Sequence, residues 1–491
     1  MYYHSTRDSS CRVTAAEAIA RGISAEGGLF VPEKLPELTA EKLQSMAGMT
    51  YAEKAKAVLG EFLTDFTPAE LADCIDQAYA PEKFDSENIA EIAKVGERDY
   101  LLELWHGPTC AFKDMALQLL PHLLTVSAAK TEPGKEIVVL VATSGDTGKA
   151  ALEGFKDVPG TRMLVFYPEN GVSRMQKRQM TTQEGGNVSV CAIKGNFDDA
   201  QTGVKKIFTD PAILAKLAEN GQKFSSANSI NWGRLAPQIV YYFAAYAQLL
   251  KAGKIAFGDE VDFCVPTGNF GDILAGYYAK RMGLPVGRLV CASNQNNVLT
   301  DFLRTGVYTA RRAFYKTSSP SMDILVSSNL ERLLWHVTGS DAEVAGLMDR
   351  LNREGSYTVR PETLAAIQGT FACGWSSEEE VAAEIRTRWE RDGYLCDTHT
   401  AVAFHVAGQH KREGVPMVVL STASPFKFPR SVLAALGHAA PENDFEAMQA
   451  LEQATGRTAP ASLAGLRQKP ERFDAVIDPS QIAEVALGYQ A

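Results

Sequence analysis

The chain has 491 residues, 45% hydrophobic and 22% charged, which is ordinary usage for a folded protein and enough length for two or three domains. Its formal net charge of −10 argues against a broad surface for nucleic acid or for an anionic membrane. The apolar runs are far shorter than the roughly 20 residues that span a bilayer, and the first residues lack the apolar segment of a signal peptide. We therefore expect a cytoplasmic protein.

The cysteines and histidines predict neither disulfides nor a metal site. The eight cysteines are scattered and form no CxxC pair, and the eight histidines show no HExxH pattern. We interpret the cysteines as reduced thiols and expect the chemistry to proceed without a metal ion.

The sequence pattern changes near residue 100 of the chain. Residues 1–95 contain amphipathic helical patterns, such as 52–59 and 68–75, each close to a turn signal. From about residue 100, short β-branched runs end in glycine-containing loops and lead into alanine-rich helical patterns. This alternation is typical of βα units around a parallel sheet.

The segment from His106 to Met115 places one lysine, Lys113, among small and apolar residues where a helix is expected to begin. Burial disfavours the charged form of a lysine, so a buried Lys113 would supply a free amine that attacks carbonyls. The alternative is a lysine that reaches solvent and pairs with Asp114. These residues alone do not decide between the two.

Two strand-to-helix junctions carry glycine-rich loops. Residues 136–142 run into the loop 143–148, and residues 261–266 run into the loop 267–272. Such a loop directs backbone amides and the positive end of a helix dipole at one point, which suits a phosphate or carboxylate. Either loop alone is equally compatible with an ordinary helix-capping turn.

The first loop resembles part of a nucleotide-binding P-loop but fails that motif twice. The motif requires glycine where Thr143 stands and a hydroxyl residue where Ala150 stands. The missing hydroxyl would be the magnesium ligand, so we do not expect nucleotide hydrolysis at this loop.

Two further segments carry polar groups. A strand predicted at 417–420 ends in hydroxyl-bearing residues 421–425, at the edge where open α/β sheets bind ligands. Residues 225–234 gather amides and hydroxyls ahead of Arg234, whose guanidinium can hold a phosphate by two hydrogen bonds. A helix cap with a surface arginine explains the latter segment equally well.

Taken together, these segments resemble the threonine synthase family, pyridoxal-phosphate enzymes with the tryptophan-synthase-β-like fold (fold type II). The resemblance extends over nearly the whole chain and rests on residues 3–7, 27–32, 106–113, the two glycine loops, 228–234, 319–324 and 421–428. It implies an α/β fold with two open, twisted, mostly parallel sheets flanked by helices. The implied domains are a helix-rich N-terminal domain (1–95), a large cofactor-binding α/β domain (96–130 and 230–491) and a small α/β domain (131–229).

The resemblance also implies a role for each candidate site residue. Lys113 would form the Schiff base with pyridoxal phosphate and then move protons as a free amine. The cofactor phosphate would lie in the second glycine loop, and Thr422 would face the pyridine nitrogen. Ser144 and Thr147 would bind the substrate carboxylate beside Asp146. In the second glycine loop, the cofactor-binding residues would be Gly268, Asn269, Phe270, Gly271 and Asp272. The substrate phosphate would be held by Asn228, Asn231 and Arg234. We expect Asp114 and Asp272 to cap the helices that follow them.

The activity implied by the resemblance is conversion of O-phospho-L-homoserine and water to L-threonine and phosphate. The overall length resembles the bacterial and fungal branch, so activation by S-adenosylmethionine is not expected, and the protein would be a monomer or homodimer. A dehydratase or cysteine synthase of the same fold would share Lys113 but would need no second anion pocket. The alternative from a different functional class is a non-catalytic protein that binds pyridoxal phosphate or a phosphorylated amino acid as a sensor.

Overall fold

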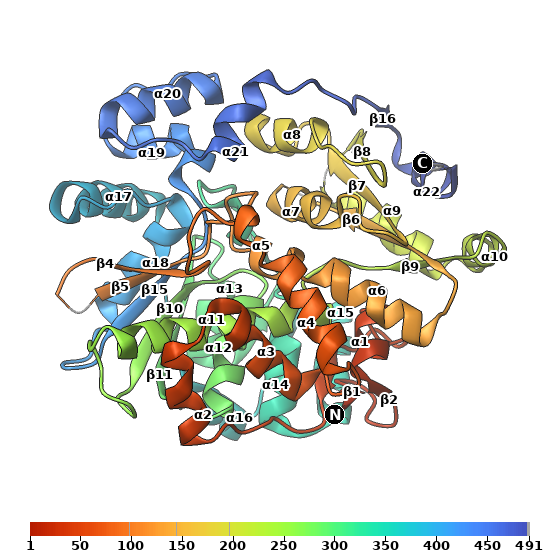
Figure 1. Ribbon diagram of the computed structural model, residues 1–491, viewed down its shortest axis with the longest axis horizontal. Helices are drawn as coiled ribbons and strands as arrows, with labels where there is room; N and C mark the ends of the chain where they lie inside the picture. The colour runs from red at the N-terminus through yellow and green to blue at the C-terminus, as the bar shows by residue number, and fades with distance from the viewer. Residues whose placement is uncertain (98, 144, 196, 489–491) are drawn as a thin grey trace.

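The computed structural model describes residues 1–97, 99–143, 145–195 and 197–488. The chain forms two main sheets with helices packed around both (Figure 1). The mixed α/β architecture with largely parallel sheets confirms the predicted fold class. Among the described helices, none is both long enough and apolar enough to cross a membrane.

The large sheet has six strands in the order β14-β11-β10-β15-β5-β4. All neighbours are parallel except β4 and β5, which pair antiparallel at one edge. The strands are β4 (Glu91–Lys94), β5 (Asp99–Glu103), β10 (Val261–Pro266), β11 (Val286–Ser293), β14 (Phe371–Trp375) and β15 (Met417–Ser421). The strands predicted at 261–266 and 417–420 are therefore present and hydrogen-bond to each other.

The small sheet has five parallel strands in the order β16-β8-β7-β6-β9. They are β6 (Glu136–Ala142), β7 (Thr161–Pro168), β8 (Val188–Ile193), β9 (Gln222–Ser225) and β16 (Val476–Ile477). The strand expected at 136–142 is present. However, β16 comes from the far C-terminal part of the chain, so the small unit includes residues beyond the expected boundary of 131–229. Figure 1 shows this segment returning to lie beside β8.

The N-terminal region contains the expected helices α3 (Tyr51–Phe62) and α4 (Pro68–Ala78), each starting with a capping box, Thr50 with Glu53 and Thr67 with Glu70. It also contains a three-stranded antiparallel sheet that the helical patterns did not predict. This sheet is built from β1 (Tyr2–Ser5), β2 (Arg12–Thr14) and β3 (Phe30–Pro32), and the other helices of the region are α1 (Ala15–Arg21) and α2 (Ala40–Ser45).

The remaining helices surround the two sheets, and β12 (Val307–Thr309) pairs with β13 (Ser356–Thr358) as a separate two-stranded antiparallel sheet. Helices of the small unit are α7 (Asp146–Phe155), α8 (Arg174–Thr181), α9 (Phe197–Thr209), α10 (Pro211–Glu219) and α22 (Ile482–Gly488). The others are α5 (Asp114–Leu117), α6 (Leu120–Thr131), α11 (Trp232–Lys251), α12 (Gly271–Arg281), α13 (Val298–Thr305), α14 (Leu330–Thr338), α15 (Asp341–Glu354), α16 (Pro361–Gln368), α17 (Glu378–Asp392), α18 (Thr398–Gln409), α19 (Pro429–Ala435), α20 (Asp444–Thr455) and α21 (Ala461–Ala464).

One hydrophobic core joins the N-terminal region to both sheets. Val139 of β6, Phe263 of β10 and Phe62 of α3 belong to this same cluster of buried side chains. The opposite faces of the two sheets have their own clusters, with Cys264 in one and Leu140 in the other. Alternate residues of a strand thus serve different cores, as the pleat requires. The N-terminal region shares its core with the rest of the chain.

Candidate active site

Lys113 lies at the start of α5, in a loop that is bound to the end of β15. The backbone N–H of Phe112 donates to the carbonyl of Thr422 at 2.8 Å, and the N–H of Ser424 donates to the carbonyl of Cys110 at 3.1 Å. Cys110 has a positive φ of 56°, a strained conformation for a residue with a side chain. Two segments more than 300 residues apart in the chain thereby place Lys113 beside Thr422, as expected of neighbours in one site.

The amine of Lys113 is suited to act unprotonated. Burial lowers the pKa of Lys113 to about 8; the nearby carboxylate of Asp146 opposes this shift, and the cations Lys427 and Arg234 add to it. Part of the side chain remains accessible on the wall of the site. With this pKa, roughly a tenth of Lys113 is a free amine at pH 7, far more than for an ordinary lysine, which favours the reactive amine over a lysine that extends into solvent.

Asp114 does not pair with Lys113. Contrary to the expectation, it does not cap the helix that follows either. Its carboxylate accepts hydrogen bonds from the backbone N–H of Thr109 at 2.8 Å and from the Thr109 hydroxyl at 2.7 Å. Burial raises the pKa of Asp114 to about 6, although these hydrogen bonds oppose the shift. The side chain reaches backwards because the loop before Lys113 needs its backbone donors satisfied, and it fixes the lysine's position.

The second glycine loop leads directly into α12, whose N-terminus has no side-chain cap. Phe270 precedes the helix with a left-handed φ of 64°. At Gly268 a Cβ atom would lie 3.0 Å from the carbonyl oxygen of Ser321, so a larger residue is poorly accommodated. An uncapped helix N-terminus is a favourable position for a phosphate. This loop, with Asn269 half-buried on it, therefore fits the expected cofactor phosphate.

Asp272 does not cap α12, and its carboxylate is directed towards α11. It accepts hydrogen bonds from the hydroxyl of Tyr241 at 2.5 Å and from that of Tyr242 at 3.2 Å. Burial raises the pKa of Asp272 to about 7, with the two hydroxyls opposing the shift. The charge conflict that an aspartate poses beside a phosphate is reduced because this carboxyl is turned away and partly protonated; only its backbone N–H remains for the cofactor.

The first glycine loop is a less suitable phosphate site. Here the Thr143 hydroxyl already accepts from the backbone N–H groups of Gly145 and Gly148, both at 3.0 Å, and α7 begins with the acidic Asp146. Thr147 is half-buried in the first turn of α7. Ser144, expected to contact the substrate carboxylate, lies outside the described residues.

Asp146 forms an ion pair inside the protein. Its Oδ1 lies 2.8 Å from the Nζ of Lys427, and both side chains are almost fully buried. Burial alone would raise the pKa of Asp146, but Lys427 and Lys113 outweigh that effect and hold the pKa well below its usual value. Lys427 was not singled out as a site residue from the sequence. The available signal was its place in the segment 421–428, directly after a strand that ends at the site.

The three residues expected to hold the substrate phosphate differ in their surroundings. Arg234 is 3% exposed; its Nη1 donates to the carbonyl of Ala227 at 2.6 Å, while its Nε has no partner among the described residues. Burial lowers the pKa of Arg234 to about 10. An unpaired donor on a buried guanidinium fits an anionic ligand.

The two asparagines, Asn231 and Asn228, differ in whether their side chains are available to a ligand. Asn231 is fully buried and caps α11: its amide donates to the carbonyls of Ile19 and Ser226 and accepts from the N–H of Gly233. Its side chain is committed within the protein, so we assign it a structural role in place of the expected substrate contact. The Asn228 side chain is half-buried and has no hydrogen-bond partner in the described part of the chain, so it stays a candidate.

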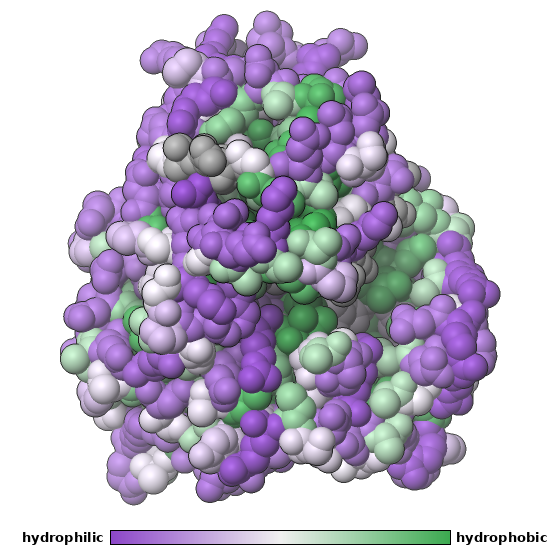
Figure 2. Space-filling model, turned by 90° about the vertical axis from the view of Figure 1, so that its right-hand side faces the viewer, coloured by the Kyte–Doolittle hydropathy of each residue, from purple (hydrophilic) through white to green (hydrophobic). Residues whose placement is uncertain are grey.

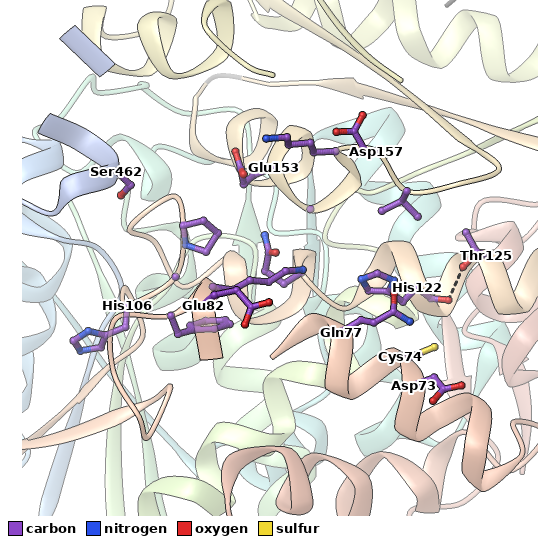
Figure 3. A pocket seen from close by; sticks show the side chains of 18 of the residues that line it. Asp73, Cys74, Gln77, Glu82, His106, His122, Thr125, Glu153, Asp157 and Ser462 are labelled. Carbon is purple, nitrogen blue, oxygen red and sulfur yellow. Dashed lines mark hydrogen bonds between the residues drawn. The ribbon is translucent and has the colours of Figure 1, made fainter. Parts of the chain in front are cut away.

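A cavity of about 1080 Å³ borders the loop that leads to Lys113. Its lining includes Gly107 and Pro108 and does not include Lys113. Figure 3 shows that Asp73, Cys74 and Gln77 of α4 line one part of this cavity and Glu153 of α7 lines another. Figure 2 shows a mostly hydrophilic face of the molecule, with hydrophobic residues gathered in a hollow at mid-height.

The fold and the site together define a pyridoxal-phosphate-dependent enzyme: a buried amine with a lowered pKa, an uncapped helix N-terminus for a phosphate, and parallel strands that end at both. Comparison with known families agrees, because residues 84–374 match the model "Pyridoxal-phosphate dependent enzyme", residues 2–79 match "Threonine synthase N terminus" and residues 400–486 match "Threonine synthase, C-terminal". The chain belongs to the threonine synthase family of pyridoxal-phosphate-dependent enzymes, which confirms the resemblance.

Individual relatives cover the chain to different extents. It is 38% identical to the threonine synthase of Pseudomonas aeruginosa, over 99% of this chain and 97% of that protein. The solved PLP-bound threonine synthase from Brucella melitensis matches with a TM-score of 0.89 at 38% identity, over 99% of both chains, and the yeast enzyme with 0.88 at 32% identity, over 99% of this chain and 97% of the other. The human protein "Threonine synthase-like 1" is 42% identical over 86% of this chain, which spans only 58% of that protein's length.

Proposed function

We propose that the protein is a threonine synthase, which converts O-phospho-L-homoserine and water to L-threonine and phosphate. The observation that carries the proposal is the presence of two cationic side chains with different tasks at one site. Lys113 has an amine of lowered pKa, and Arg234 has a guanidinium donor with no partner in the described structure. A dehydratase or cysteine synthase requires the first group alone.

The residues of the site fit pyridoxal phosphate. Lys113 would attach the cofactor through its amine, the backbone amides of Gly271 and Asp272 at the start of α12 would bind its phosphate, and Thr422 would face the pyridine nitrogen. When bound, the cofactor withdraws electrons from the amino acid attached to it. A threonine hydroxyl does not stabilise a positive pyridine nitrogen as an aspartate does, so this chain would make the cofactor a weaker electron sink.

The chain's own groups perform the proton transfers and the anion binding. With a pKa of about 8, Lys113 has both protonation states populated near neutral pH, so it can remove a proton and return one. Arg234, with Asn228 beside it, would bind the substrate phosphate and stabilise the charge that builds up as phosphate departs. The carboxylate of the substrate would bind at Thr147 and Ser144, on the first glycine loop.

The experiment is a product assay with the purified, cofactor-loaded protein. O-Phosphohomoserine is supplied, and threonine, inorganic phosphate and 2-oxo acid are measured together. Equal amounts of threonine and phosphate are expected. Phosphate with a 2-oxo acid and without threonine would assign an elimination instead, and the absence of any phosphate release would favour the sensor. We further propose a cytoplasmic location, a monomeric or homodimeric state and no activation by S-adenosylmethionine.

A further inference from the structure

The Asp146 carboxylate occupies a position where the site otherwise gathers positive charge. Lys427, 3% exposed, places its ammonium 2.8 Å from Asp146 and also donates to the carbonyl of Thr109 at 2.9 Å. Lys427 and Arg234 are both close enough to Lys113 to lower its pKa, and Asp146 is close enough to raise it. Two cationic side chains, Lys427 and Lys113, therefore act on one buried carboxylate, and the buried Arg234 lies close to Lys113.

That carboxylate joins the two units of the fold. Asp146 is the first residue of α7, which follows strand β6 of the small sheet. Lys427 follows β15 of the large sheet, and the hydroxyl of Ser321, which comes from the same large unit, donates to Asp146 Oδ2 at 3.3 Å. From its own unit Asp146 receives one hydrogen bond, from the amide of Gln176 at 3.2 Å. The contacts of Asp146 thus cross the site.

The balance of charge favours an incoming anion. Buried cations require a counter-charge, and Asp146 together with the partly protonated Asp114, which is close enough to Lys427 to interact with it, does not neutralise Lys427, Arg234 and the protonated fraction of Lys113. The Nε of Arg234 is buried without a partner, so the cluster also has a free donor. A phosphate dianion provides the missing charge and several acceptor oxygens.

We propose that the Asp146 carboxylate pairs with Lys427 in the free enzyme in place of the substrate phosphate. When substrate binds, Lys427 exchanges Asp146 for the phosphate. Lys427 is then an anion-binding residue alongside Arg234. The exchange breaks the contact between Asp146 and Lys427, so arrival of the anion changes how the small and large units are held together. The identity of the anion as substrate phosphate rests on the proposed function; the exchange itself does not.

The test measures binding of inorganic phosphate to the cofactor-loaded enzyme by titration calorimetry, in a double-mutant cycle of Asp146→Asn and Lys427→Met. Asp146→Asn is expected to bind phosphate about tenfold more tightly than wild type, because it leaves the ammonium of Lys427 available. Lys427→Met is expected to weaken phosphate binding about tenfold. In the double variant the tightening by Asp146→Asn should disappear.

Controls separate exchange from a structural ion pair. Lys427→Arg keeps the charge and should retain phosphate binding, whereas Asp146→Ser provides a second neutral variant if the asparagine variant fails to fold. Unchanged or weaker phosphate binding in both folded Asp146 variants, or tightening that persists without Lys427, would overturn the exchange. Phosphate binding needs no turnover, so failure of the wild type to form threonine would refute the proposed function and leave this cycle interpretable.

Discussion

Replacing Gly154 by alanine tests whether the contact between α7 and α5 sets the geometry of the site. Gly154 lies in α7, where a Cβ atom would stand 1.9 Å from the carbonyl oxygen of Leu117, the last residue of α5. Helix α5 starts next to Lys113, and α7 starts at Asp146. A side chain at this contact would therefore displace the two helices whose ends carry the lysine amine and its neighbouring carboxylate.

The expected magnitude follows from two opposing effects. In the interior of a helix, alanine is more stable than glycine by about 1 kcal/mol. At Gly154 the obstacle is backbone, and the helices must separate by more than 1 Å before the contact reaches the 3.0 Å that real Cβ atoms require. Overpacking of this kind costs about 1–3 kcal/mol. We expect Gly154→Ala to lower the free energy of unfolding by about 2 kcal/mol and to reduce threonine formation.

The assay is urea unfolding of Gly154→Ala beside a matched control. Gly346 lies in the middle of α15 on the surface, where a Cβ atom would meet nothing within 4 Å. Gly346→Ala should therefore stabilise the protein by about 1 kcal/mol. If the two substitutions shifted the unfolding midpoint in the same direction, the close contact between α7 and α5 would not limit the site.

Three further outcomes are expected. Lys113→Ala should lose the visible absorbance of the bound cofactor and nearly all threonine formation, and normal turnover would exclude the assigned role. Arg234→Ala should raise KM for phosphohomoserine about a hundredfold, as loss of a charged bidentate contact predicts, and an unaltered concentration dependence would contradict the phosphate role. The raised pKa of Asp272, about 7, means that the folded state keeps a proton that the unfolded state loses above about pH 4, so stability falls as pH rises from about 4 to 7. Urea unfolding of the cofactor-free protein at pH 5.5 and 7.5 should show that loss, on the order of 1 kcal/mol per pH unit, reduced in Asp272→Asn; equal pH dependence in both proteins would show that Asp272 is not responsible.

The strand, loop and helix order around the site could be predicted from sequence because those signals are local. The strands at 136–142 and 261–266 appear where the pattern placed them. A glycine loop and a helix follow each strand in the expected order, but the helices begin at Asp146 and Gly271, inside the loops predicted at 143–148 and 267–272. The apolar neighbours of Lys113 made its burial one of two alternatives, and they did not decide between them.

The contacts between distant segments could not be predicted in this way. Lys427 and Asp146 are 281 residues apart, and nothing local to either residue indicates that they meet. Asn231 has the chemistry of a ligand-binding amide, yet its surroundings use all of that capacity for a helix cap. The orientation of Asp272 towards Tyr241 depends on the packing of α11 against α12, which no pattern within either helix specifies.

The closing of the small sheet by β16 also has a consequence for how the protein is made. While the ribosome synthesises the chain, β6 to β9 are complete long before residues 476–488 exist. Until then, β8 presents an unpaired edge, and the core beneath the sheet lacks Ile482 and Ala486. An open strand edge is a template for pairing with another chain. The small unit therefore depends on residues 476–488 for its protection, and nascent chains that stop before them expose an unpaired strand edge.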